Sequence, residues 1–370
     1  MRTALAVGAR LGRTPSAARE AQAELLAIDP LHHLARAEEH LDGTIAGDLA
    51  DRLGGEFPGQ TLLELAIGYH NLGLPDDALT LLELPVAGPP SSVRQAWRAF
   101  LRDDPALLEN PASPELAFPY RRESLRVMEW ADARSPHWLW SYLHALNLWA
   151  VDREDEALGL VRGLGEQPDF APFYVTRARL TERATVGEPV RDLRHAVELA
   201  PQTRILHVYL IQALQDRGRW DEALDAVGPA GARFPGDFNL ALLKARTLIH
   251  LGRGAEATAI LGDIQVLPSE NARESHQLWE QAHALAALDD LESGRTDRAV
   301  SHLRSALEWP ESLGQGRPYE PEERLARFLL AVAADRAGRG PGDAWDLVIP
   351  PSALSGAPTR LDLLSVVALG

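Results

Sequence analysis

The chain has 370 residues, of which 45% are hydrophobic and 24% are charged, and this is enough apolar material for a packed interior. Its net charge of −16 argues against nucleic acid and anionic membranes as partners, because both attract clustered positive charge. The absence of cysteine excludes disulfides and thiolate metal sites.

The N-terminal segment does not have the pattern of a secretion signal. Its apolar stretch, residues 4–7, is followed closely by Arg10 and by no cleavage site. No segment of the sequence is long and apolar enough to span a bilayer. We therefore expect a cytoplasmic protein, and we expect residues 1–58 to form irregular helical repeats that begin without a polar capping unit.

A repeated pattern follows in residues 62–84, 207–235, 241–264 and 283–306. In each stretch an alanine stands five positions after a glycine, and a small residue typically stands seven positions before that glycine. Ala223 and Ala257, which hold the same position in neighbouring repeats, are 34 residues apart. The pattern resembles the tetratricopeptide repeat, a 34-residue pair of antiparallel helices.

Each repeated position has a physical reason in such a helix pair. The glycine would end the first helix, because it adopts the left-handed backbone conformation without steric cost. The alanines would lie where neighbouring helices approach closely. Acidic pairs such as Asp221-Glu222 would begin the second helix, near the positive end of its dipole.

The resemblance predicts an all-α fold, a right-handed superhelical solenoid of antiparallel helix pairs with roughly nine units. We expect the regular array over residues 59–349, with irregular stretches near 103–137 and 265–277. The apolar C-terminal tail, residues 350–370, is expected to dock on the array or on a partner.

Aromatic residues are concentrated in the irregular part of the array. Two interpretations are open for them. They could form a platform for sugar rings or for a partner's proline and aromatic side chains, or they could fill the core of the irregular repeat. The residues are Phe118, Tyr120, Trp130, Trp138, Trp140, Tyr142 and Trp149.

The concave face of such a solenoid is lined by the first helix of each pair. The register set by the glycines places a polar, amide-rich set of side chains on that face. This set could hydrogen-bond an extended peptide or sugar hydroxyls, and it would equally suit an ordinary solvated groove. The predicted groove residues are His70, Asn71, Tyr142, Trp149, Arg177, Gln212, Gln215, Asn239, Arg246 and His250.

Several short sequence segments are not explained by the generic repeat pattern. They include residues 118–123, 127–131, 168–174, 267–270 and 309–319. Together they resemble the C-terminal repeat region of a family of large bacterial proteins of unknown function. In that family a β-rich domain, similar to mutarotase and glycosidase-accessory folds, precedes the repeats. The resemblance implies carbohydrate or a separate β-rich domain as a partner.

No catalytic or metal-binding motif stands out. The histidine pairs His137/His144 and His276/His283 are seven residues apart, too far for one metal ion on a helix. We therefore predict a non-enzymatic scaffold that binds protein or peptide in a polar groove, without a cofactor or metal. The alternative is an accessory or partial subunit of a carbohydrate-active protein, in which the aromatic residues of 118–149 contact sugar or a β-rich domain.

Overall fold

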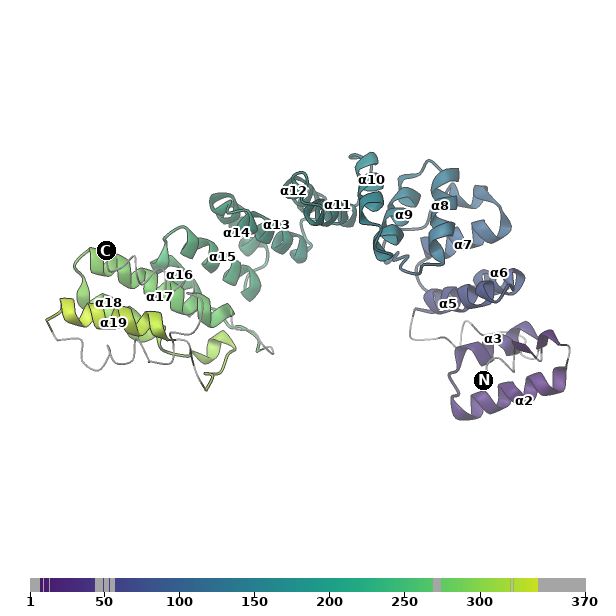
Figure 1. Cartoon of the computed structure of the whole chain (residues 1–370), viewed down its shortest axis with the longest axis horizontal. Coiled ribbons are helices and arrows are strands. Elements are labelled where there is room, and N and C mark those ends of the chain that lie inside the picture. The colour runs from purple at the N-terminus through teal and green to yellow at the C-terminus, as the bar shows by residue number, and fades with distance from the viewer. Residues whose placement is uncertain are drawn as a thin grey trace. The chain divides into compact units, whose positions relative to one another are not determined.

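The computed structural model describes residues 7–8, 10–12, 14–43, 49, 53, 57–268, 274–319, 321 and 323–338. Within these residues there are 17 α-helices, two short 3-10 helices and no strand (Figure 1). The chain divides into two compact units, Met1–Gly187 and Glu188–Gly370. The predicted C-terminal tail, 350–370, lies outside the described residues.

In both units each helix packs against the next helix along the chain, so neighbours in sequence are neighbours in space. This sequential packing is typical of a helical solenoid and confirms the predicted all-α fold of tetratricopeptide-like helix pairs. The first unit contains α2 (Pro15–Ile28), α3 (His33–Leu41), α5 (Pro58–Asn71), α6 (Pro75–Glu83), α7 (Ser92–Arg102), η1 (Pro105–Leu108), α8 (Ser124–Arg134), α9 (Trp138–Ala150), α10 (Glu154–Gly163) and α11 (Ala171–Arg183). The second unit contains α12 (Pro189–Leu199), α13 (Arg204–Asp216), α14 (Trp220–Arg233), α15 (Phe238–His250), α16 (Gly254–Gly262), α17 (Glu274–Glu292), α18 (Thr296–Ala306), η2 (Glu311–Leu313) and α19 (Arg324–Arg336).

The repeated glycines end the first helix of a pair, as predicted. All four have a left-handed backbone, with φ between 67° and 76°: Gly73, Gly218, Gly252 and Gly294. The next residue turns its N–H back onto the helix just ended, as in the 2.9 Å bond from Arg219 N to Leu214 O. Asp152 holds the same position before α10 without being glycine, with φ 63°.

The repeated alanines lie where the helices meet. Seven of them are fully buried: Ala66, Ala78, Ala223, Ala245, Ala257, Ala287 and Ala299. A larger side chain at such a position would separate the helices. One repeat departs from the small-residue rule, because Ile211 stands seven positions before Gly218, and it is buried as well.

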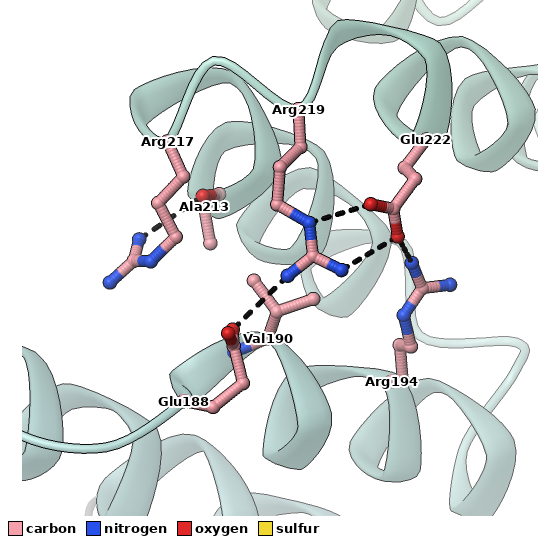
Figure 2. Close-up of polar contacts among 7 residues, drawn as sticks. All are labelled: Glu188, Val190, Arg194, Ala213, Arg217, Arg219 and Glu222. Atoms are coloured by element: carbon pink, nitrogen blue, oxygen red, sulfur yellow. Dashed lines mark hydrogen bonds and ion pairs between the residues drawn. The ribbon is translucent and has the colours of Figure 1, made fainter.

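An arginine follows the turn residue in four repeats, and Figure 2 shows one of them. Arg219 donates two hydrogen bonds of 2.7 Å to Glu222 and one of 3.2 Å to Glu188. Arg194 of the preceding second helix, α12, donates to the same Glu222 at 2.6 Å. The hydrogen bonds from Arg219 lower the pKa of Glu222. These surface charges are therefore paired within the solenoid and connect neighbouring second helices.

The irregular stretch predicted after residue 103 is present between α7 and α8. Gln95 of α7 holds it in place, donating to Leu107 O at 2.6 Å and Asn110 O at 2.9 Å and accepting from Ala112 N at 2.8 Å. Trp140 of α9 donates to the carbonyl of η1 at Leu108, 3.1 Å away. A stretch without regular structure is thus fixed by side chains of the helices on which it lies.

Candidate binding surface

All of the predicted groove residues lie on first helices of pairs, namely α5, α9, α11, α13 and α15. The structure separates them by burial. Three are buried, and the others are half-buried or exposed. The buried three are Tyr142, Arg177 and Gln215.

Tyr142 and Gln215 each connect one first helix to the next. The Tyr142 hydroxyl lies 3.2 Å from Thr176 Oγ1, and burial raises the pKa of Tyr142 to about 12 despite that hydrogen bond. The Gln215 amide donates to Leu243 O and to Thr247 Oγ1, both at 2.8 Å. Polar groups removed from water need such partners, so these side chains hold repeats together.

Arg177 is buried against its own helix, α11, and the loop that precedes it. Its guanidinium donates to the Gly165 carbonyl, and its Cζ lies 5.2 and 5.1 Å from the ring centres of Phe173 and Tyr174. The cation is held by a carbonyl and by two aromatic faces. Arg177 is therefore part of the interior of the first unit.

Three predicted groove residues in the first unit reach the surface at least in part. Asn71 is exposed and donates to Glu123 Oε1 at 3.1 Å. His70 is half-buried, with its ring edge-on to Trp97 at 5.3 Å between centres. Trp149 is also half-buried. This part of the face offers a few polar atoms beside aromatic rings.

In the second unit the half-buried or exposed members are Gln212, Asn239, Arg246 and His250. Arg246 forms an ion pair with Glu274 of α17. His250 stacks flat on Trp220, with the ring centres 3.8 Å apart and the planes at 4°. Two of the four side chains are thus held in place by neighbouring helices.

A hollow of about 670 Å³ lies on another face of α15 and is walled by α14 and α16. Gly228 and Gly231 of α14 line it, and a Cβ added at either glycine would meet no atom within 4 Å. Lys244, the only lysine of the sequence, also lines it. Because Lys244 and Arg246 are two positions apart, they lie about 200° apart around the helix. The hollow and the predicted groove residues are therefore separate features.

The aromatic residues predicted as a platform or core, which we call the aromatic cluster, also differ in burial. Trp140 and Tyr142 are buried, as the core interpretation predicts for them. Trp130 and Trp138 are half-buried. Trp130 lies edge-on to Phe100, and Trp138 packs near Tyr142 at 6.2 Å between ring centres. Trp140 and Tyr142 thus lie in the core, whereas Trp130 and Trp138 lie partly at the surface.

The two exposed aromatic residues of the cluster form a row with an exposed leucine in residues 116–120. Leu116, Phe118 and Tyr120 are 63%, 67% and 54% exposed, whereas Ala117 and Pro119 between them are buried. From Ala117 to Tyr120 this alternation is typical of an extended chain with one side packed, whereas Leu116 lies in the turn just before it. Leu116 has φ 57°, a left-handed conformation that is rare for a residue with a bulky side chain. We call Leu116, Phe118 and Tyr120 the apolar row.

Hydrogen bonds to side chains of α9 and α5 fix the position of the apolar row. The buried Asn147 of α9 donates to Pro119 O at 2.7 Å and to Arg121 O at 3.0 Å. The Tyr120 hydroxyl donates to Glu64 Oε1 of α5 at 2.6 Å, and Arg121 pairs with the same carboxylate. Burial alone would raise the pKa of Glu64, but hydrogen bonds from Arg121 and Tyr120 outweigh it and lower the pKa.

Sequence reasoning selected Phe118 and Tyr120 but missed Leu116, Glu64 and Asn147. Nothing in the sequence marks the last two as partners of the row, because Glu64 is 56 residues away from Tyr120 and Asn147 is 28 away from Pro119. The exposed leucine carries no signal either, since its left-handed backbone is a property of the folded segment.

Within the described residues no group of three or more histidine, aspartate or glutamate side chains is arranged to hold a metal ion. No helix among them is both long and apolar enough to cross a membrane.

Comparison with known proteins finds no family model and no curated protein that matches the sequence significantly. Among solved structures, a tetratricopeptide repeat protein from Parabacteroides merdae is 15% identical over 74% of this chain and 98% of that one, with a TM-score of 0.33. PilW, a type IV pilus biogenesis factor, is 14% identical over 61% and 96%, with a TM-score of 0.35. A tetratricopeptide protein of Thermus thermophilus is 21% identical over 46% and 90%, with a TM-score of 0.27. These TM-scores lie below 0.5, so the likenesses do not extend to function.

Proposed function

We propose that this protein is a non-enzymatic repeat scaffold that binds a protein or peptide, and that the apolar row makes the central contact in the first unit. The observation that carries the proposal is the exposure of three large apolar side chains within five residues. Scattered apolar residues are normal on a protein surface, but a contiguous group is typical of an interaction site.

The way the apolar row is fixed supports this function. Asn147 and Glu64 hold the backbone and the Tyr120 ring before any partner arrives. A partner therefore loses little free energy in ordering the row, because the segment is already in place. Phenylalanine and tyrosine also have few rotatable bonds, which makes them frequent anchors in binding surfaces.

Leu116 is the second observation in favour of a binding role. A left-handed conformation costs a residue with a Cβ about 1–2 kcal/mol, and glycine would avoid this cost. Here the strained residue is also largely exposed, so its side chain contributes little to the core. Strain of this kind is concentrated at functional sites.

The polar first-helix residues form the second part of the proposal. Asn71 in the first unit, and Gln212, Asn239, Arg246 and His250 in the second unit, present donors and acceptors on first helices. Such groups suit the backbone of an extended peptide. Each unit would then bind a segment of partner on its own first-helix face.

The alternative partner is carbohydrate, or a separate β-rich domain of a carbohydrate-active system. Tyr120 favours the sugar, because its ring lies beside the carboxylate of Glu64 and the guanidinium of Arg121. Sugar sites combine an aromatic face with nearby polar groups in this way.

The test is a selection of peptides from a random library on the purified full chain, followed by affinity measurement. We expect selected peptides rich in proline or aromatic residues to bind the parent, and to bind the double variant Leu116→Ser/Phe118→Ser at least about tenfold more weakly. Leu267→Ser, which changes an equally exposed leucine of the second unit, is the matched control and should bind like the parent.

Unchanged peptide affinity in the double variant would remove the apolar row from the proposal. Binding of oligosaccharides that is lost in the same variant, without selection of any peptide, would favour the carbohydrate alternative.

A further inference from the structure

Helix α7 carries a stripe of three arginines, Arg94, Arg98 and Arg102, spaced by four residues and so on one face. Arg102 forms an ion pair with Glu83 of α6. Arg94 donates through one guanidinium nitrogen to two carbonyls at the end of α6, those of Leu82 and Leu84. Among the described residues, no hydrogen bond or ion pair engages the side chain of Arg98, which lies between them.

A hollow of about 290 Å³ lies where Arg94 and Arg98 meet the irregular stretch after η1. None of the described residues that line it is acidic. The Nε atoms of both arginines are buried and have no acceptor. Gln95, bound to Leu107 O and Asn110 O, keeps the facing wall in place.

The hollow lacks a counter-charge although the chain has 53 acidic and only 37 basic residues. Burial and the neighbouring charge of Arg98 lower the pKa of Arg94. Buried donors without acceptors, and like charges close together, both destabilise a fold. A bound anion would relieve both effects at once.

We propose that this hollow is a binding site for a small oxyanion, a carboxylate or a phosphate group, held between the guanidinium groups of Arg94 and Arg98. The planar guanidinium matches two oxygens of such a group with paired hydrogen bonds. Ser91 and Asn110 line the same hollow and add polar groups to the site. Its volume lies at the lower limit of about 300 Å³ for ligand pockets, which favours a small group over a large ligand.

The anion has two possible sources, a free small molecule or an acidic side chain of a bound protein. Two probes separate them: inorganic phosphate, and N-acetyl-aspartate amide as a substitute for an acidic side chain. Each is titrated into the full chain at low and constant ionic strength, and binding is followed by the NMR signals of the arginine Nε–H groups and by the melting temperature.

We expect saturable binding of at least one probe to the parent and, equally well, to Arg102→Gln, which removes a paired arginine from the same stripe. Arg98→Gln should bind about tenfold more weakly or worse, the loss of one charge-assisted pair of hydrogen bonds. Without anion, Arg98→Gln should melt no lower than the parent, because it removes an unpaired charge. Stronger binding of phosphate indicates a free anion, and stronger binding of the amide indicates a protein side chain.

Three results would overturn the proposal: no saturable binding of either probe, parent-like binding by Arg98→Gln, or equal losses in Arg98→Gln and Arg102→Gln. If Arg98→Gln does not fold, Arg98→Lys serves in its place, since lysine keeps the charge but loses the paired geometry. It should bind several-fold more weakly than the parent, and parent-like binding by it would count against the site.

Discussion

At the scale of single residues, His283 shows how the interior of the second unit responds to protons. Its Nδ1 lies 3.1 Å from Nδ1 of His302, its ring lies edge-on to Trp279, and its Nε2 is buried without a partner. Burial, together with the nearby His302, lowers the pKa of His283 from 6.5 to about 4. The folded protein therefore resists a proton that the unfolded chain accepts.

This shift predicts that stability decreases as the pH is lowered from about 6.5 to about 4. Below that window His283 causes no further loss. Over the window the loss is up to about 1.4 kcal/mol for each pH unit. Urea unfolding of the parent and of His283→Gln at pH 7 and pH 5 measures it. We expect a smaller pH effect in His283→Gln, whereas His195→Gln, at a half-exposed position, should keep the parent's pH dependence. Equal pH effects in all three proteins would contradict the assignment.

At the scale of elements, the helix ends could be predicted because their chemistry is local. Gly218 has φ 67° and ends α13, so Gly218→Ala should destabilise the protein by about 1 kcal/mol. Gly159, exposed inside α10, has open space where a Cβ would lie, so Gly159→Ala should stabilise it by about 0.5–1 kcal/mol. Chemical denaturation of both variants measures these effects. The same sign for both would mean that conformation at the turn is not what selects glycine.

The face of a helix that carries function was harder to predict. Gln212 and Gln215 are three positions apart on α13, and the sequence offers no reason to separate them. In the structure Gln212 is exposed, whereas Gln215 is buried against Leu243 and Thr247 of α15. The difference arises from the neighbouring repeat, which covers one side of the helix and leaves the other open.

At the scale of the whole molecule, the chain has two compact units, and each helix contacts mainly its neighbours along the sequence. Stability in such an array is approximately a sum of local terms. Overpacking the core of the second unit with Ala257→Leu, at a cost of about 1–3 kcal/mol, should therefore reduce hydrogen-exchange protection in α15–α17 and leave α5–α6 unchanged. Ala66→Leu should do the reverse. Equal loss of protection in both units from either variant would show that they unfold as one.

The sequence by itself determined the helix pairs, their turns and their close contacts, because each depends on a glycine, an alanine or a charge within one repeat. It also located the irregular stretch after residue 103, where that spacing fails. Only the tertiary structure decided what this stretch does. Folded over α7 and α9, one part of it exposes Leu116 and Phe118, and another part, which includes Leu107 and Asn110, lines the hollow at Arg98. The row depends on Glu64 and Asn147, which are distant in the chain, and the hollow depends on how the stretch after η1 folds back onto α7; no local pattern records such contacts.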